Sequence, residues 1–498
     1  MSLRSNEILT AVIHGARKDE PSSEVQLAAI HALFNSLEFV RENFEREVCS
    51  MSFGSIRWLN DSQGERNYIM QVVCEATQNG AVNVQVGAFE CLVRIMSLYY
   101  EKMGLYMEQA LFGVSFFLLF ISKLAELKLF VVDCCRYETS RRACGFAGRR
   151  ILVHCLRRGG RTSYRSPGGI SPNFGLWTMT KGDYQAQEYG DAPETESKFF
   201  AKIALPEIVP VLLQLLCQQE EDADDDEWNV SMAAGTCLSL LAGAVQDAIV
   251  PAVIPFIEAH IKAEDWHRRE AAIMTFGSIL EGPDPTVLTP LVNQALPLLI
   301  DMMTDQNVHV KDTTAWTLGR ICDLLITCIK PDAHLHPLIS ALVNGLQDSP
   351  RIVANCCWAL MNLADQYVYF EEEGEATQAG PLSPYYEGVV QALMRVTDRY
   401  VLENSRYQSA HSKVLNSTGN EANFRTAAYE AITSYLTHAT PDAIGVVQST
   451  AVTVLQRMEH LLSIQNQILG VDDRNNWNEL QSNLCAVVIV SYMLVAFQ

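Results

Sequence analysis

A period of 42 residues runs through the middle of the chain and restricts its fold more than any other feature. Glycines, large apolar residues and branched aliphatic residues return at this interval without a gap. The aligned columns are Gly235, Gly277, Gly319 and Met361; Met232, Met274, Trp316 and Trp358; Ala234, Phe276, Leu318 and Leu360; and Ile279, Ile321 and Leu363. A period near 40 carried by apolar and small residues is typical of paired-helix repeats of the HEAT or armadillo kind. The pattern predicts an all-α solenoid, a right-handed superhelix of antiparallel helix pairs, which works by binding along an extended surface.

Apolar spacing within each repeat predicts the individual helices. Ala272, Phe276 and Ile279 recur at i, i+4 and i+7, which places them on one helical face. A turn is expected at 263–265 and a break at 281–285, where glycine and two prolines cluster. The expected helix pairs are 250–261 with 268–280, 287–303 with 308–325, 335–345 with 351–364, 8–16 with 25–39, 68–76 with 82–100, and two further pairs within 385–498.

The charge and cysteine content narrow the class of partner. The chain has 498 residues and a formal net charge of −21, with a pI near 5.0. An acidic surface disfavours direct binding of nucleic acid and favours basic partners. The 14 cysteines are scattered without a disulfide framework, which indicates a reducing compartment. The N-terminus lacks the apolar core of a signal peptide, and the last apolar run, 486–497, is shorter than a membrane span requires.

Residues 113–183 break the repeat pattern. This segment carries nine arginines between Arg136 and Arg165 and a net charge of +8 from 12 basic and 4 acidic residues, and it shows no helical period. It is open to three interpretations: a membrane anchor with a basic flank, a basic disordered insert, or translated non-coding sequence from a faulty gene model, which we favour. The expected organisation is therefore helical repeats over 1–112, an atypical basic insert over 113–183, and repeats over 184–498.

Two tryptophans in one column are candidates for binding. Trp316 lies two residues from both Thr314 and Leu318 on the packing stripe of its helix, about 200° away around the helix axis. It is therefore expected to point away from the main stripe, and Trp358 occupies the same column one repeat later. The alternative is that these rings fill the seam between neighbouring repeats.

An acidic run over 220–227 ends at Trp228 and is expected between the two helices of one repeat. It is either a solvated loop or a flexible anionic strap that closes over a basic peptide. Arginine and lysine stems of such a peptide would stack on tryptophan faces while the carboxylates neutralise the charge. The sequence contains no glycine-rich phosphate loop, zinc-protease motif or serine-hydrolase elbow, and its histidines and cysteines match no metal-ligand spacing. No enzyme, cofactor or metal function is predicted.

Several long runs resemble the importin beta (karyopherin beta) family. The runs lie at 5–11, 68–76, 222–229, 267–283 and 312–322, and the match covers 1–48, 65–112 and 186–498. Residues 49–64 and 113–185 depart from it. The resemblance implies a HEAT-repeat nuclear import receptor that moves between cytoplasm and nucleus and acts at the nuclear pore. A generic HEAT-repeat scaffold, such as a phosphatase regulatory subunit, is the alternative.

The resemblance also implies partners and site residues. The family binds the basic importin-beta-binding segment of importin alpha, or basic cargo, with an acidic loop and a row of tryptophans. It binds phenylalanine-glycine nucleoporins in shallow grooves between outer helices. Ran-GTP releases cargo, largely through N-terminal repeats that this chain is expected to lack, so Ran binding is expected to be weakened. The matching residues here are Asp222, Asp224, Asp225, Asp226, Glu227, Trp228, Trp316 and Trp358 for the basic segment, and Leu9, Thr10, Ile13, Glu65, Tyr68 and Ile69 for nucleoporins.

Overall fold

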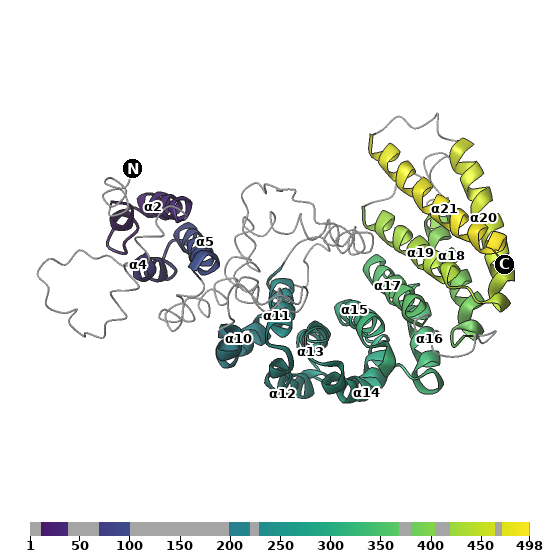
Figure 1. The fold of residues 1–498 in the computed structure, drawn as a ribbon, viewed down its shortest axis with the longest axis horizontal. Coiled ribbons are helices and arrows are strands. Elements are labelled where there is room, and N and C mark those ends of the chain that lie inside the picture. Colours follow the sequence, from purple (N-terminus) through teal and green to yellow (C-terminus); the bar gives the residue numbers. More distant parts are fainter. Residues whose placement is uncertain are drawn as a thin grey trace, which may run out of the picture. The chain divides into compact units, whose positions relative to one another are not determined.

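The structure, a computed structural model, describes residues 11–37, 69–99, 199–219, 229–367, 380–403, 419–463 and 471–497. Over these ranges the chain forms helices and turns and no strand, which confirms the predicted all-α class (Figure 1). The chain divides into two compact units, Met1–Phe256 and Ile257–Gln498, so the division falls inside one helix. The atypical segment 113–183 lies outside the described residues.

The helices of the first unit are α2 (Ser23–Ser36), α4 (Ile69–Ala76), α5 (Val82–Tyr99), α10 (Phe200–Leu216), α11 (Val230–Val245) and the short η2 (Gln246–Ile249). Helix α12 (Val250–His260) crosses the division. The long helices of the second unit are α13 (Trp266–Ser278), α14 (Pro285–Met302), α15 (Val308–Leu324), α16 (His336–Gly345), α17 (Pro350–Tyr367), α18 (Tyr386–Glu403), α19 (Gly419–Thr437), α20 (Ile444–Ser463) and α21 (Val471–Phe497). Short turns of helix lie between them at η3 (Ile326–Cys328), η4 (Pro331–Leu335), η6 (Ser383–Tyr385) and η8 (Pro441–Ala443).

Stacked helix pairs build the second unit. Helices α14, α16, α18 and α20 each pack against the helix that follows them, and α13, α15, α17, α19 and α21 pack one on the next (Figure 1). We call this second set the second-helix row. One helix pair therefore corresponds to one period of the sequence repeat. The expected pairs over 287–325 and 335–364 are confirmed to within a few residues, and the two pairs expected within 385–498 are α18–α19 and α20–α21.

Capping residues fix the first residues of α14 and α15. The break expected at 281–285 ends one residue earlier, because Asp284 caps α14 by accepting a hydrogen bond from the Thr286 amide at 2.8 Å. Pro285 then begins the helix, at a position whose missing N–H would have no partner in any case. Asn307 caps α15 in the same way, accepting from the amides of His309 at 2.9 Å and Val310 at 3.3 Å.

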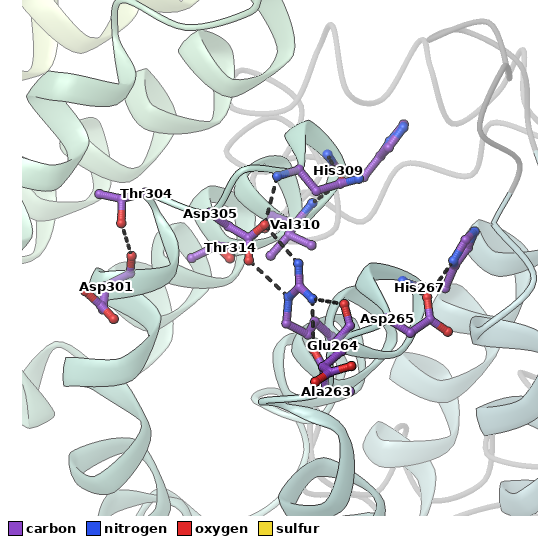
Figure 2. Close-up of polar contacts among 12 residues, drawn as sticks. Ala263, Glu264, Asp265, His267, Asp301, Thr304, Asp305, His309, Val310 and Thr314 are labelled. Atoms are coloured by element: carbon purple, nitrogen blue, oxygen red, sulfur yellow. Dashed lines mark hydrogen bonds and ion pairs between the residues drawn. The ribbon is translucent and has the colours of Figure 1, made fainter.

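A repeated ion pair joins the turns of successive repeats. Figure 2 shows the first of these pairs, at Asp305. The guanidinium of Arg269 donates from Nε and Nη2 to the Asp305 carboxylate of the next repeat, at 3.0 and 3.1 Å. Its Nη1 donates to the backbone oxygens of Ala263 and Glu264, at 2.8 and 2.7 Å. One repeat later Lys311 pairs with Asp348. These contacts fix the offset between neighbouring helix pairs at their turns.

The first unit contains one described apolar core shared by α2, α4 and α5. Fully buried members include Ile30, Leu33, Val73, Ala88 and Ile95. In the same unit, α10 packs against α11. The stretch Val230–His260 is long and apolar enough to meet a composition test for crossing a membrane, the single such stretch in the part of the chain that the structure describes. It is divided here between α11 and α12, because Gln246 adopts φ 53° between them.

Candidate binding surface

The two candidate tryptophans occupy equivalent places on successive members of the second-helix row. Trp316 lies on α15 and Trp358 on α17, and both are half-buried. Each indole is seated on the glycine one repeat earlier. A Cβ atom added to Gly277 would lie 2.4 Å from Cζ3 of Trp316, and one added to Gly319 would lie 2.4 Å from Cε3 of Trp358. Only glycine leaves room for these rings.

The glycine and tryptophan columns of the sequence are therefore two halves of one contact. Gly277 and Gly319 are each followed, one repeat later, by a tryptophan that needs the space. The column then carries Met361, and α19 contains no tryptophan. The sequence showed both columns, but it did not show that the tryptophan rings pack on the glycines of the previous repeat.

The expectation that both rings point away from the packing stripe is correct only in part. Thr314 and Leu318, on the stripe, are completely buried, whereas Trp316 between them is only half-buried. However, the benzo edges of both indoles pack in the seam between neighbouring helices, which was the alternative interpretation. The reason is that the repeats stack closely enough for a side chain on the flank of one helix to reach the backbone of the previous one.

Buried hydrogen bonds hold the helices on either side of each ring. Thr313 Oγ1 donates to Glu270 Oε1 at 2.7 Å, and one repeat later Asn355 Nδ2 donates to Asp312 Oδ1, also at 2.7 Å. Glu270 and Asp312 are 5% and 8% exposed, so these acids are paired inside the stack rather than offered to a partner. Asn362 Nδ2 also donates to the Gly319 carbonyl at 3.1 Å, beside the seat of the Trp358 ring. These bonds fix the separation of the helices and thereby the position of the rings.

One residue of this surface was missed at the sequence level. Arg320 lies four residues after Trp316, and its guanidinium carbon lies over the indole, 5.4 Å from the ring centroid. Its Nη2 donates to Glu281 Oε2 at 3.2 Å, just beyond the end of α13. A spacing of four between tryptophan and arginine on a predicted helix is the signal that would have revealed this contact.

The acidic run lies outside the described residues, together with Trp228. The described chain leaves α10 at Leu216 and returns at Asn229, which caps α11 by accepting from the Met232 amide at 2.9 Å. The acidic run therefore lies between α10 and α11 in the chain. The remaining members of the expected set therefore stay predictions: Asp222, Asp224, Asp225, Asp226 and Glu227.

The two described nucleoporin candidates are buried in an apolar core, and the groove itself stays a prediction. Ile13 is 5% exposed and Ile69 is 2% exposed, and both belong to the apolar core of α2, α4 and α5. Their apolar side chains face the neighbouring helices, so as placed they offer little surface to a ligand. Leu9, Thr10, Glu65 and Tyr68 lie outside the described residues.

The described part of the chain offers little that could bind or convert a small molecule. A cavity of about 40 Å³ lies beside η6 and is lined by residues that include Tyr386, Tyr435 and His438. It has room for one or two waters rather than for a substrate. Burial raises the pKa of the thiols of Cys322 and Cys357, which keeps them protonated and poorly nucleophilic. Among the described histidines, cysteines and acids, no cluster is arranged to hold a metal ion.

Comparison with known proteins identifies the family of this helical-repeat chain. A family model described as importin subunit beta-1-like TPR repeats matches residues 337–418 and 412–493, and one for HEAT-like repeats matches 266–321. Importin subunit beta-1 of Schizosaccharomyces pombe is 42% identical over 488 residues, which cover 98% of this chain and 48% of that protein. The chain belongs to the importin beta family. It spans about half the length of this relative.

Solved members of the importin beta family have the same fold. The structure of a Kap95:Nup1 complex superimposes with a TM-score of 0.72 at 33% identity, covering 98% of this chain and 48% of that one. A structure of Kap95p with RanGDP gives a TM-score of 0.71 at 33% identity with the same coverage. The predicted HEAT-repeat solenoid is thereby confirmed, and the Kap95 chain in these structures was captured with a nucleoporin and with Ran.

Proposed function

We propose that this chain carries part of the binding surface of a nuclear import receptor, and that a basic protein segment docks on it. The observation that carries the proposal is the similarity to importin subunit beta-1 over 98% of the chain. The generic HEAT scaffold is less well supported, because the chain is 42% identical to importin subunit beta-1 of Schizosaccharomyces pombe over 98% of its length.

The proposed ligand is the basic importin-beta-binding segment of importin alpha, or a basic cargo segment. Trp316 and Trp358 lie one repeat apart and are only half-buried, so they offer two aromatic surfaces at the spacing of the helix stack. Arginine and lysine side chains stack favourably on indole faces. Asp224, Asp225 and Asp226, with their acidic neighbours, would attract the segment from a distance and pair with its charges.

We further propose nucleoporin and Ran as partners, by analogy with the captured Kap95 complexes. Such a receptor would be found in cytoplasm and nucleus and at the pore. Because Ile13 is 5% exposed, an Ile13→Asp change would bury a charge and disrupt the core rather than test ligand contact. Tyr68→Ser is the better test, with Asn83→Ser on the exposed side of α5 as control. Reduced retention of the Tyr68 variant alone on immobilised phenylalanine-glycine repeats is the expected result.

The test of the basic site separates charge from stacking by measuring association and dissociation rates. Replacing Asp224, Asp225 and Asp226 together by Asn should lower the association rate for the importin alpha segment by about tenfold at low salt, with little effect on dissociation. The matched control replaces exposed Glu258, Glu387 and Glu459 by Gln, which removes the same charge elsewhere. The difference between the two triple variants should shrink as salt rises, because exposed charges are screened within about 8–10 Å at physiological ionic strength.

The contribution of stacking is tested with the double variant Trp316→Met and Trp358→Met. Methionine is chosen because Met274 occupies the same column one repeat earlier, whereas alanine would leave a gap over Gly277 and Gly319. The double variant should raise the dissociation rate by about tenfold or more and keep its helical circular dichroism. Unchanged kinetics in both arms would place the binding site elsewhere.

A further inference from the structure

Trp316 and Trp358 share the same glycine seat, but their surroundings differ in charge. The guanidinium of Arg320 lies over the Trp316 indole, and its side chain is 14% exposed. Glu281 binds the same guanidinium at 3.2 Å and is 49% exposed, so the ion pair sits at the edge of the seam. An arginine of this chain therefore already covers part of the Trp316 ring.

Trp358 lacks such a cover among the described residues. The position four residues after it is Asn362, which is 1% exposed and donates its amide to the Gly319 carbonyl. Arg351, on the same helix, is paired with Asp312 at 2.8 Å. The two rings, equivalent by sequence column and by seat, thus present different surfaces to a ligand.

We propose that Arg320 is a built-in competitor for the Trp316 ring. It occupies ring surface that an arginine or lysine of a docking segment would use, so Trp358 is the principal aromatic anchor and Trp316 contributes only when Arg320 moves aside. The inference rests on the proposed binding of a basic segment and assigns different roles to the two tryptophans. It also gives Glu281 a function, because its carboxylate holds the competing guanidinium in place.

The size of the effect follows from the strength of a cation–π contact. At a partly exposed site such a contact is worth about a factor of two to five in binding. A docking cation gains that factor only if it does not first have to displace another cation. Removing Arg320 should therefore slow dissociation by about two- to fivefold, and this gain should vanish when the indole is removed as well.

The experiment is a double-mutant cycle on dissociation of a synthetic arginine-rich helical peptide. The proteins are the unaltered chain, Arg320→Gln, Trp316→Met and the double variant, with Arg268→Gln as a control for loss of one positive charge. Arg268 is exposed and lies near the opposite end of α13 from Gly277. A peptide with citrulline in place of every arginine reports contacts that do not depend on charge. Urea unfolding of each variant verifies that it is folded.

We expect Arg320→Gln to slow dissociation when Trp316 is present and to have no effect beyond that of Arg268→Gln when it is absent. Glu281→Gln, which loosens the guanidinium without removing it, should change dissociation in the same direction by a smaller factor, and it replaces Arg320→Gln if that variant is unstable. Equal effects of Arg320→Gln in both backgrounds, or faster dissociation, would overturn the proposal. If Trp358→Met weakens peptide binding but the effects of Arg320→Gln and Trp316→Met are additive, only this inference fails. If the peptide does not bind at all, the proposed function fails as well.

Discussion

At the residue scale, the decisive contact is an indole seated on a glycine. Helix α15 takes part in two such contacts, because its Trp316 ring packs on Gly277 of α13 and its Gly319 receives the Trp358 ring of α17. Glycine in a helix interior normally costs stability. Its presence here is explained by the ring that needs the space.

Gly319→Ala should therefore destabilise the protein. An added Cβ would lie 2.4 and 2.5 Å from two ring atoms of Trp358, and such overpacking costs about 1–3 kcal/mol. Gly388→Ala on α18 is the control, because nothing lies within 4 Å of its Cβ position, and there the change should stabilise by about 0.5–1 kcal/mol. Urea unfolding measures both. Recovery of stability in Gly319→Ala with Trp358→Met would tie the loss to the ring, whereas equal behaviour of the two alanine variants would contradict the seat.

Buried thiols give a second prediction at this scale. Desolvation raises the pKa of Cys322, Cys356 and Cys357 on α15 and α17, and each is completely buried. Timed alkylation with iodoacetamide, followed by mass spectrometry, should therefore modify half-buried Cys217 and Cys485 well before these three. Early modification of Cys322 would indicate that α15 opens readily.

Raised thiol pKa values also predict how the free energy of unfolding changes at alkaline pH. A thiol whose folded pKa is raised contributes fully to stability below the unfolded pKa, near 8.5, and loses that contribution as pH rises toward the folded value. Burial raises the pKa of Cys74 to about 11. The free energy of unfolding should accordingly fall between about pH 8.5 and 11, as measured by urea unfolding across that range.

At the element scale, one bridging side chain joins three helices of successive repeats. Arg457 on α20 donates from Nη1 to Thr397 Oγ1 at 2.6 Å and to the Tyr429 hydroxyl at 3.1 Å. Its Nη2 donates to Asp398 Oδ2 at 2.6 Å. Helix α20 is thereby joined to both helices of the previous pair, α18 and α19.

Arg457→Met should loosen this junction while keeping most of the apolar stem. Arg457 is 22% exposed, and loss of its hydrogen bonds should cost about 1–3 kcal/mol, toward the lower end because Asp398 is 49% exposed. Hydrogen exchange should show lower protection in α20 and α21 and unchanged protection in α13 and α15. Arg395→Met, at an exposed position on α18, is the control and should have little effect. Uniform loss across the unit would mean that its repeats unfold together.

At the scale of the whole molecule, the repeat architecture predicts that a destabilising substitution affects mainly its own repeat and the neighbouring ones. Each pair in the second unit packs on its neighbours, so stability is close to a sum of repeat and interface contributions. Gly319→Ala should lower hydrogen-exchange protection in α15 and α17 and progressively less in more distant helices. Protection in α2 and α5, in the other unit, should not change. A loss of protection in α2 or α5 equal to that in α15 would show that the two units unfold as one.

Much of the architecture was predictable from the sequence because it depends on local periodicity. The spacing of Ala272, Phe276 and Ile279 defines a helical face, and the 42-residue return of Gly277 and Gly319 defines the pairing of helices. Helix ends were predicted to within a few residues, and the earlier start of α14 comes from its cap, Asp284. The importin beta resemblance depended on the same runs.

The sequence by itself determined the helices, their pairing and the columns that recur from repeat to repeat, because those follow from which residues are apolar at i, i+3 and i+4. Only the tertiary structure decided what each column contacts. Whether Trp316 meets solvent or the previous helix, whether Ile13 lines a groove or a core, and whether Arg320 lies over a ring all depend on how closely the repeats stack. That distance is set by contacts between residues about 40 positions apart, which no pattern within one helix encodes.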